Sequence, residues 1–346
     1  MYVSTAPITK QPMIQTVYSR DVIRAEAERL YEKLKPLHRE YVECEAIAPV
    51  TLEINRLKKE KNAVILAHNY QIPEIIYGVS DFTGDSYGLS KQASKTKTNT
   101  IIFCGVHFMA ETAKIINPAK RVLIPSLKAG CSLSESITAE DVRALKKKYL
   151  GIKVACYINT SAAVKAESDV CVTSANAAKI IERLPGESVI FIPDEYMAKN
   201  IARQTTKKII TWNGKCMVHE QFTPQMIQGQ RERFPQAKVL AHWECAPHVI
   251  QEADFVGGTT DMVNYVKSSP AGTFVTITEC GMSDVLRQEF PSKTFVTPCT
   301  ICPHMKQINL TNILECLQEE KNEITIPEDV RIRALACINK MFELGN

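Results

Sequence analysis

A strand–helix pattern that occurs three times constrains the fold of this chain more than any other feature. The copies begin with apolar runs at 63–70, 153–160 and 238–245, and each continues through further strand–helix units to a last strand and a loop. The repeated unit is about 85 residues long, which is the size of a small βαβ domain rather than of a solenoid repeat. Strands that alternate with helices indicate parallel sheets joined by right-handed crossovers. The sequence therefore predicts three similar α/β domains.

Each copy of the pattern ends in a cysteine. These residues are Cys131, Cys216 and Cys302, and they are separated by 85 and 86 residues. With twelve cysteines in the chain, chance can produce such intervals, but it seldom puts cysteines at the same point of three matching patterns. Functional groups of parallel sheets lie beyond the carboxyl ends of the strands. Three domains related by pseudo-threefold symmetry would therefore bring the three sulfurs to one axis.

The pair Cys299-x-x-Cys302 leaves several kinds of site open. A structural zinc site usually takes four protein ligands, often from two close pairs, and this chain has one such pair. Zinc held by the three repeated cysteines plus His219 or His304 stays open, as does a [4Fe–4S] cluster, which normally takes four thiolates. With three thiolates, one iron would be free to act as a Lewis acid. A thioredoxin-like role is disfavoured, because the pair does not follow the first strand of a βαβ unit.

Polar and ring side chains follow the first strand of each copy, and a small hydroxyl residue opens the next helix. The strand ends carry His68, Tyr70, Tyr157, Asn159, His242 and Glu244, and the helix openings carry Ser86, Ser174 and Thr259. A serine or threonine at a helix start is usually only a cap. The N–H groups there also favour carboxylate or phosphate. Because these residues recur at equivalent places, they predict a shared site for a small anionic substrate.

The overall composition excludes some classes of partner. Lysine and arginine number 42 against 38 acids, a net charge of +4, and no basic stripe interleaved with aromatic residues appears, so nucleic acid is not favoured. No apolar run approaches the roughly 18 residues that span a bilayer. The N-terminal residues lack the charged start and apolar stretch of a signal peptide. The sequence predicts a cytoplasmic protein with no membrane partner.

A set of motifs resembles the quinolinate synthase A family, whose iron–sulfur enzymes act in NAD biosynthesis. The matching stretches are AHNYQ, GDS, CGVHFMAETAKI, CSL, YINTSAAVKA, TSANA, PDEYMAKNIA, NGKCMVHEQF and CPHM. They extend from about residue 60 to residue 345, which is most of the chain. Any one of them would be a weak signal, but together they are highly specific.

The resemblance implies a fold and a cofactor. The expected fold is α/β, with three homologous αβα sandwich domains whose parallel sheets are arranged with pseudo-threefold symmetry around one [4Fe–4S] cluster per chain. The implied ligands are Cys131, Cys216 and Cys302. Cys302 is implied rather than Cys299 because the family ligand precedes Pro-x-Met, which is PHM in this chain. Cys299 would then be a neighbour of the ligand, either a bystander or redox-active.

Five segments are expected along the chain. They are an N-terminal helical extension (1–60), three αβα repeats (61–150, 151–235 and 236–312) and a C-terminal helical segment (313–346) that packs on the repeats. Both terminal segments contain apolar residues at helical spacing, which is typical of amphipathic helices that pack against a core.

The resemblance also implies a reaction. The family joins iminoaspartate to dihydroxyacetone phosphate, loses phosphate and water, and closes the ring of quinolinate. The implied substrate contacts are His68, Ser86, Tyr157, Asn159, Ser174, His242, Glu244 and Thr259. We expect Glu244 to act as the general acid–base with a pKa raised by desolvation, and His68 and Tyr70 to relay protons or orient the triose. L-aspartate oxidase or aspartate dehydrogenase would be the functional partner that supplies unstable iminoaspartate.

Two residues depart from the family pattern, and two other functions stay open. Trp243 stands where proline is frequent, and strand alternation predicts that it points away from the site. Gly258 stands where serine is frequent, which removes a hydroxyl donor. The alternatives are another [4Fe–4S] hydro-lyase acting on a small hydroxy acid, and a zinc-stabilised module that binds a dicarboxylate.

Overall fold

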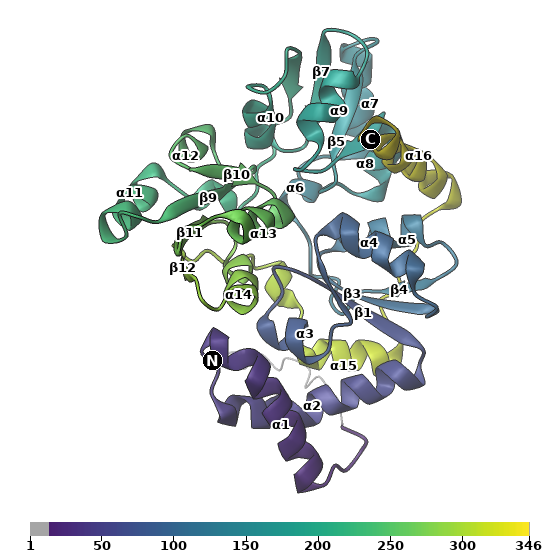
Figure 1. Cartoon of the computed structure of the whole chain (residues 1–346). Coiled ribbons are helices and arrows are strands. Elements are labelled where there is room, and N and C mark those ends of the chain that lie inside the picture. The colour runs from purple at the N-terminus through teal and green to yellow at the C-terminus, as the bar shows by residue number, and fades with distance from the viewer. Residues whose placement is uncertain (1–13, 346) are drawn as a thin grey trace, which may run out of the picture.

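Three four-stranded parallel sheets form the body of the chain. Figure 1 shows the computed structural model, which describes residues 14–345 except the side chains of Ser86, Tyr87, Ser90 and Ala93. In every sheet the first strand of the repeat lies between the second and the third, and the fourth follows the third at the edge. All neighbouring strands are parallel. The expected fold class of three α/β domains is therefore confirmed.

The first sheet and its helices show why this order forms. The strands are β1 (Ala63–His68), β2 (Phe82–Gly84), β3 (Thr100–Cys104) and β4 (Arg121–Leu123), and the helices are α3 (Pro73–Gly78), α4 (Ser86–Lys95) and α5 (His107–Ile116). Every residue of β1 is buried, as expected of a parallel strand that helices cover on both faces. The crossover helices return the chain to the same edge each time, so the strand ends that carry polar residues gather on one side.

The second and third sheets repeat this arrangement. The second has β5 (Lys153–Tyr157), α8 (Ala162–Glu167), β6 (Val170–Val172), α9 (Ala177–Arg183), β7 (Ser188–Ile192), α10 (Glu195–Ile201) and β8 (Lys208–Thr211). The third has β9 (Lys238–His242), α12 (Pro247–Ile250), β10 (Phe255–Gly257), α13 (Thr259–Ser268), β11 (Thr273–Ile277), α14 (Cys280–Glu289) and β12 (Thr294–Val296). The connections between sheets contain α6 (Ser132–Glu135), α7 (Ala139–Lys148), η2 (His219–Gln221) and α11 (Pro224–Arg233).

In each copy, one aspartate connects the start of the second strand to the backbone of the first strand. This contact was not predicted from the sequence. The carboxylates of Asp81, Asp169 and Asp254 accept the backbone N–H of Ile65 (2.8 Å), Val154 (2.9 Å) and Val239 (2.8 Å), respectively. The N–H of each aspartate donates back to the carbonyl of the same partner at 2.9 Å. The repeat therefore extends to individual side-chain contacts that fix where the second strand begins.

The terminal helices complete the first two domains. They are α1 (Arg20–Leu34), η1 (Lys35–Leu37) and α2 (Tyr41–Glu60) at the start, and η3 (Met305–Gln307), α15 (Leu310–Glu319) and α16 (Glu328–Gly345) at the end. Helices α2 and α15 pack together in the core of the first sheet, and α16 packs on that of the second. The expected segment borders stay a prediction. Within the described residues, no helix is both long and apolar enough to cross a membrane.

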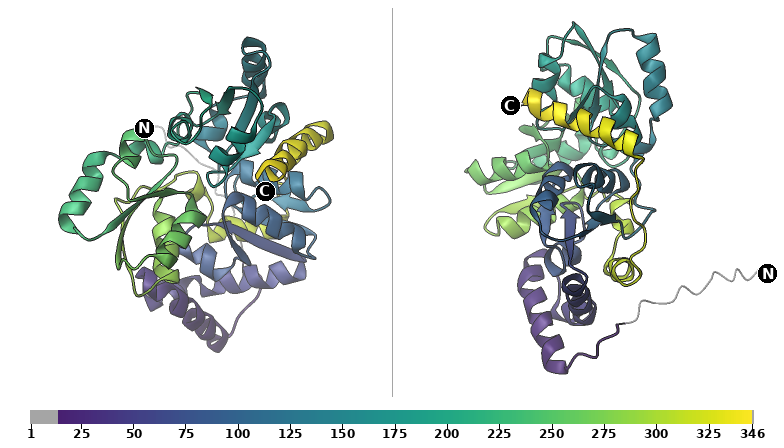
Figure 2. Two further views of the ribbon diagram at one scale, coloured as in Figure 1. Left: turned by 45° about the horizontal axis from the view of Figure 1, so that its top comes forward. Right: turned by 90° about the vertical axis from the view of Figure 1, so that its right-hand side faces the viewer.

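The carboxyl ends of the three sheets lie around one centre. Figure 2 shows the three domains grouped around the middle of the molecule, with the terminal helices on the outside. The last residues of the three first strands, His68, Tyr157 and His242, all line one cavity. The fold thus places one strand end from each domain at the same site.

Candidate active site and metal centre

The three predicted metal-ligand cysteines lie in loops with the same backbone anchor. In each domain, the first residue of the helix after the third strand donates its N–H to the carbonyl two residues before the cysteine. The three bonds are His107 N to Ala129 O (2.7 Å), Glu195 N to Gly214 O (2.8 Å) and Cys280 N to Thr300 O (3.1 Å). The loops of Cys131, Cys216 and Cys302 are therefore equivalent in space as well as in sequence.

Each of these sulfurs lies in a turn whose N–H groups face it. Burial raises the pKa of all three free thiols, to about 12 for Cys131. Two backbone N–H groups near each sulfur oppose this effect of burial and lower the thiol pKa: those of Leu133 and Ser134 at Cys131, of Val218 and His219 at Cys216, and of His304 and Met305 at Cys302. Such N–H groups favour the thiolate, and in iron–sulfur proteins they also tune the reduction potential.

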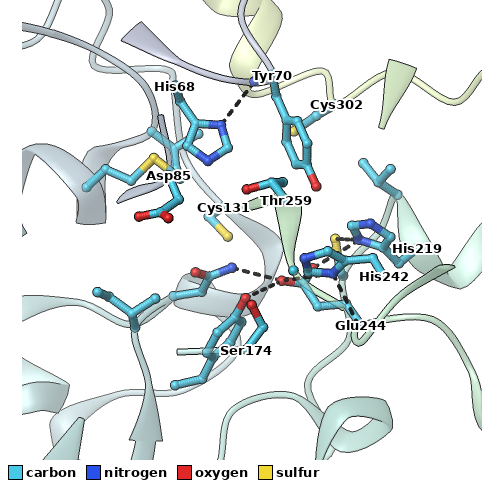
Figure 3. A pocket seen from close by; sticks show the side chains of 18 of the residues that line it. His68, Tyr70, Asp85, Cys131, Ser174, His219, His242, Glu244, Thr259 and Cys302 are labelled. Carbon is cyan, nitrogen blue, oxygen red and sulfur yellow. Dashed lines mark hydrogen bonds and ion pairs between the residues drawn. The ribbon is translucent and has the colours of Figure 1, made fainter. Parts of the chain in front are cut away.

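The three thiols share a cavity and differ in exposure from every other free cysteine. They line a cavity of about 300 Å³ between the domains. Cys131, Cys216 and Cys302 are partly exposed, whereas the seven other free cysteines are buried. Figure 3 shows Cys131 and Cys302 facing this cavity from different parts of the chain. One thiol from each domain fits a cluster with three cysteine ligands, and it does not fit a four-cysteine zinc site.

Cys299, expected to be a bystander or a redox-active neighbour of the ligand, is a paired cysteine. It forms a disulfide with Cys280, the first residue of α14, with 5.3 Å between the two Cα atoms. The pair is 19 residues apart in sequence. A parallel bridge between Glu279 and Thr300 brings the two segments together. The two cysteines come together only when the third sheet has formed. The disulfide could therefore not be predicted from the motif Cys-x-x-Cys.

The residues predicted at the strand ends surround the same cavity. Its lining includes His68, Tyr70, Tyr157, Asn159, Ser174, His242, Glu244 and Thr259 (Figure 3). Thr259 opens α13 as expected, but Ser174 lies three residues before α9 rather than at its start. Ser86 opens α4, and its side chain lies outside the described residues. Every predicted contact that the structure describes is thus a wall residue of one cavity.

Glu244 is contacted by two residues of the second domain and by His219 of the connection that follows it. Its Oε1 accepts from Tyr157 OH (2.8 Å) and Asn159 Nδ2 (3.2 Å), and its Oε2 lies 3.0 Å from His219 Nδ1. Burial alone would raise the pKa of this carboxyl, but His242, His219 and Tyr157 more than offset burial and leave the pKa below its usual value. The expectation of a raised pKa is therefore wrong, because the donors around the carboxylate favour its ionised form.

A chain of hydrogen bonds connects Glu244 to Tyr70. His219 Nδ1 faces the carboxylate, and its Nε2 lies 3.0 Å from Thr278 Oγ1, which in turn lies 2.9 Å from Tyr70 OH. Sequence reasoning considered His219 only as a zinc ligand and missed Thr278. The available signal was the place of His219, three residues after Cys216, in the turn whose N–H groups face the sulfur.

Burial fixes the protonation of the ring side chains in the cavity. It lowers the pKa of His68 and of His242 to about 4, so both imidazoles are neutral at neutral pH. It raises the pKa of Tyr70 and of Tyr157 well above the usual range, so both phenols keep their protons. The cavity therefore presents these neutral rings together with the carboxyl groups of Asp85, Asp261 and Glu244.

Positive charge lies behind the cavity wall instead of in it. None of the described lining residues is a lysine or an arginine. Fully buried Lys165 lies 5.5 Å from the ring centroid of Phe108, which lines the cavity. Lys306 donates to the backbone carbonyl of Tyr70 at 2.5 Å. Lys306 also pairs with buried Glu279 at 2.9 Å, which balances its charge, so Lys165 is the lysine that would attract an anion in the cavity, without a direct ion pair.

The two residues that depart from the family pattern have different surroundings. Trp243 packs against the core of the second sheet and lines another cavity, so it points away from the site as expected. Gly258 lies against the hydroxyl of Ser174, and a Cβ at this position would overlap that hydroxyl. Glycine therefore leaves room for Ser174, in addition to lacking a donor of its own.

Comparisons with known proteins agree with this site. Residues 52–343 match the model of the family described as Quinolinate synthetase A protein. The chain is 48% identical over 326 residues to the quinolinate synthase of Caulobacter vibrioides, covering 93% of this chain and 89% of that protein. It is 52% identical over 289 residues to quinolinate synthase 1 of Mesorhizobium japonicum, covering 84% and 89%. With this extent of similarity, the chain belongs to the quinolinate synthetase A family.

Proposed function

We propose that this chain condenses iminoaspartate with dihydroxyacetone phosphate to quinolinate, phosphate and water in the cavity between its three domains. Family membership makes it a quinolinate synthase, an enzyme of NAD biosynthesis, and removes the alternatives of another hydro-lyase and of a zinc-stabilised binding module. The observation that carries the assignment of the site is the convergence of three equivalent cysteine loops and three strand ends on one cavity.

The family consists of iron–sulfur enzymes, and we assign the cluster to three residues of this chain. Cys131, Cys216 and Cys302 would hold a [4Fe–4S] cluster. Each comes from a different domain, lines the cavity and faces two backbone N–H groups, which supports this assignment. When bound, the cluster supplies a Lewis acid, at the iron without a cysteine, that polarises a substrate oxygen or nitrogen.

Neutral donors and a helix start are assigned to the anionic groups of the substrates. Thr259 is the first residue of α13, where N–H groups and the helix dipole favour a carboxylate or a phosphate. Ser174 and Asn159 present a hydroxyl and an amide to the same cavity. Neutral donors hold an anion without the strong pairing that a lining arginine would impose, which suits a phosphate that must leave after it is released.

Glu244 is assigned the role of proton acceptor. Its low pKa keeps it in the ionised form, which is the form that would accept a proton from the substrate during isomerisation and return it during dehydration. Tyr70, which is protonated, can donate its own proton to the substrate and be reprotonated by the chain through Thr278 and His219. His68 packs edge-on against Tyr70, with 4.8 Å between ring centroids, and is assigned to orient the triose.

The chemistry of the substrates points to a partner and a compartment. Iminoaspartate hydrolyses readily in water, so we assign its supply to an enzyme that oxidises aspartate, such as L-aspartate oxidase or aspartate dehydrogenase. A cytoplasmic location is proposed on the same chemical grounds, because an iron without a protein ligand needs reducing surroundings to survive.

The two cysteines of one motif allow a matched test of the cluster ligands. After anaerobic reconstitution, the parent chain should contain about four irons and four sulfides. Cys302→Ser should lose the brown absorbance and most of the iron. Cys299→Ser is the control, since Cys299 lies in a disulfide, and it should keep both. Equal loss of iron in the two variants would show that the ligand assignment is wrong.

The role of Glu244 has its own test. Glu244→Gln keeps the shape of the side chain and its contacts with Tyr157 but cannot accept a proton, so quinolinate formation should fall by about 100-fold or more while the iron content stays constant. Glu220→Gln is the matched control, because Glu220 is exposed and paired with Lys215 outside the cavity. Glu244→Gln turning over at the parent rate would exclude Glu244 as the proton acceptor.

A further inference from the structure

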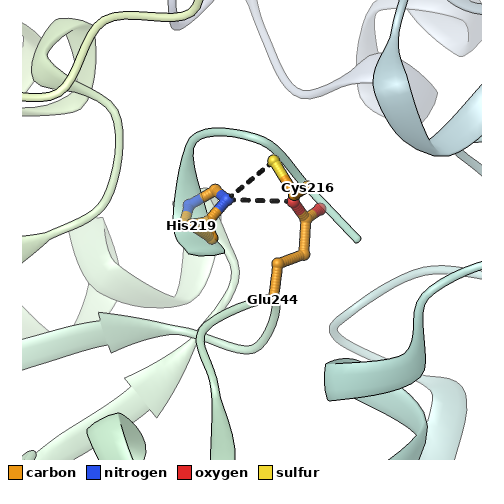
Figure 4. A group of neighbouring side chains, drawn as sticks. All are labelled: Cys216, His219 and Glu244. Carbon is orange, nitrogen blue, oxygen red and sulfur yellow. Dashed lines mark hydrogen bonds and ion pairs between the residues drawn. The ribbon is translucent and has the colours of Figure 1, made fainter. Parts of the chain in front are cut away.

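Three different metal-binding side chains meet on one side of the cavity. Cys216 Sγ, His219 Nδ1 and a carboxylate oxygen of Glu244 all lie within 4.8 Å of one another. His219 Nδ1 is 3.2 Å from the sulfur and 3.0 Å from Glu244 Oε2. Figure 4 shows the three side chains directed at a common point, with the imidazole nitrogen facing both partners. Ligand atoms of tetrahedral zinc are about 3.3–3.6 Å apart, so the two distances to His219 Nδ1 would each widen by a few tenths of an ångström to admit the ion.

The outer atoms of these ligands already have partners. His219 Nε2 lies 3.0 Å from Thr278 Oγ1, and in the tautomer that donates from Nε2 to this hydroxyl, Nδ1 would offer its lone pair to a metal in place of its contacts with Glu244 and Cys216. Glu244 Oε1 accepts from Tyr157 and Asn159, and Oε2, which faces His219, is the oxygen that would bind the ion. Outer partners of this kind fix the orientation and tautomer of metal ligands. The arrangement is therefore that of a prepared site and not a chance meeting of three side chains.

We propose that the cluster-free chain binds one zinc ion, or another divalent late transition metal, through Cys216, His219 and Glu244. The thiolate and the carboxylate together balance the two charges of the ion, and the neutral imidazole completes a set of soft and borderline ligands that zinc accepts. Three protein ligands leave the fourth position to water. Binding releases the proton of the buried thiol, because the thiolate is the form that ligates.

This site excludes the cluster, because Cys216 belongs to both. A zinc ion at Cys216 removes one of the three thiolates assigned to the cluster and also occupies Glu244. Cys131 and Cys302 are needed only for the cluster, and His219 only for zinc. The inference uses the cysteine assignment of the proposed function only for this competition, and metal binding by the cluster-free chain tests it separately.

Cobalt titration of the cluster-free chain, prepared anaerobically, tests the site directly. Co²⁺ replaces zinc in such sites, and it gives a sulfur-to-cobalt charge-transfer band and intense visible bands when four-coordinate. The parent chain should bind one Co²⁺ with both signals, and one equivalent of Zn²⁺ should abolish them. Failure of the parent chain to bind cobalt with a thiolate signal would overturn the proposal.

A set of variants separates this site from one made by the three cysteines. His219→Ala and Glu244→Gln should each weaken cobalt binding by about 100-fold or more, and Thr278→Val, which removes an outer partner, by about 10-fold. Cys131→Ser and Cys302→Ser are matched controls and should bind cobalt as the parent does. Loss of the signal in these two controls, with His219→Ala unaffected, would assign the metal to the three cysteines and overturn the proposal.

Cluster assembly gives an independent measurement. Zinc added before reconstitution should reduce iron incorporation in the parent chain by about 10-fold or more, and it should have little effect on His219→Ala, in which the competing site is removed. Circular dichroism of each variant identifies any that fails to fold. If His219→Ala or Glu244→Gln fails to fold, cobalt binding by Thr278→Val and Cys302→Ser tests the proposal instead. Weaker binding by Thr278→Val alone would support the site, and weaker binding by Cys302→Ser alone would overturn it. Equal inhibition by zinc in the parent and in folded His219→Ala would refute competition at this site.

Discussion

The carboxyl ends of β5 and β9 both line the cavity. After each strand, one buried side chain donates hydrogen bonds to two backbone carbonyls. At β5 this side chain is Lys165, which is fully buried. Its Nζ donates to the carbonyls of Ile158 (2.8 Å) and Thr160. These two carbonyls flank Asn159, which donates to the carboxylate of Glu244.

The end of β9 is also held by two hydrogen bonds from one buried side chain, but this side chain is a neutral amide rather than an ammonium group. Asn200 Nδ2 donates to the carbonyls of Trp243 and Cys245, each at 2.8 Å, and these carbonyls flank Glu244. Asn200 is also buried, but it is neutral and comes from α10 of the second domain. The support of the third-domain strand end therefore crosses a domain interface.

The difference shows how the two halves of the Glu244 environment are assembled. Lys165 lies in α8, the helix that follows β5, so the β5 end is formed within one domain. It also contributes a positive charge, and no ion pair of Lys165 is found among the residues that the structure describes. The β9 end depends on docking of the second domain against the third. One end is thus charged and local, and the other is neutral and depends on the interface.

Replacing the hydrogen-bond donor of Asn200 with an acceptor should have the largest effect on stability and on the rate of quinolinate formation. Asn200→Asp replaces a donor with a carboxylate oxygen that faces two buried carbonyls, so two hydrogen bonds become repulsive contacts. We expect a loss of about 3 kcal/mol or more in the free energy of unfolding and at least about a 100-fold loss of quinolinate formation. Chemical unfolding and steady-state rates measure both.

A second asparagine provides the control for this substitution. Asn309 caps α15 with its oxygen, which accepts the N–H of Asn312 at 2.9 Å, so Asn309→Asp keeps the bond that matters. It should leave stability and rate nearly unchanged. If Asn200→Asp were as mild as Asn309→Asp, the interface contact would not hold Glu244, and the comparison of the two strand ends would fail.

Removal of the local charge should have a smaller effect of a different kind. Lys165→Met leaves two carbonyls unpaired but also relieves the desolvation of a buried ammonium, so stability should change less than in Asn200→Asp. A charge about 10 Å from an anion contributes about 1–2 kcal/mol at an effective dielectric constant of 20. We therefore expect KM for dihydroxyacetone phosphate to rise about 10-fold.

An exposed lysine of the same domain is the control for charge. Lys146 pairs with Asp169 on the surface, and Lys146→Met should leave KM unchanged. If Lys165→Met lowered stability as Asn200→Asp does and left KM unchanged, Lys165 would serve only to hold the strand end. The charge would then play no part in substrate binding.

The same contrast explains which features were predictable from the sequence. The repeat, the parallel sheets and the shared cavity follow from patterns that lie within each copy, and the β5 end is of this kind. Tyr157, Asn159 and Lys165 lie within nine residues of one another. Such a local pattern can be recognised in the sequence, because the residues that contact one another are close together in the chain.

The failures all concern contacts between distant segments. The low pKa of Glu244 depends on Tyr157, 87 residues away, and on His219, which reaches it from another loop. The disulfide of Cys299 depends on the edge of the third sheet, and the support from Asn200 depends on how two domains dock. These features depend on how distant segments pack. Residue types and spacing therefore predicted neither the direction of the Glu244 pKa shift nor the partners of Cys299 and Asn200.

Acid should weaken the β9 end more than the β5 end, and this is the smallest effect that we expect. His242 ends β9, and burial lowers its pKa from about 6.5 in an unfolded chain to about 4. Between these pH values the unfolded state binds a proton that the folded state does not. Stability is therefore fully present above pH 6.5 and falls as pH decreases towards 4. Tyr157, the equivalent residue of β5, keeps its proton throughout this range.

Urea unfolding of the cluster-free chain at pH 7 and pH 5 measures this difference. His242→Asn retains an acceptor for the N–H of Glu244 but cannot titrate, so it should lose less stability over this interval than the parent, by about 2 kcal/mol. Tyr157→Phe should keep the full acid sensitivity of the parent, since it changes the β5 end only. If both variants lost the same free energy as the parent, the neutral imidazole of His242 would not be part of what stabilises the β9 end. The two strand ends would then differ in the origin of their support and not in their response to pH.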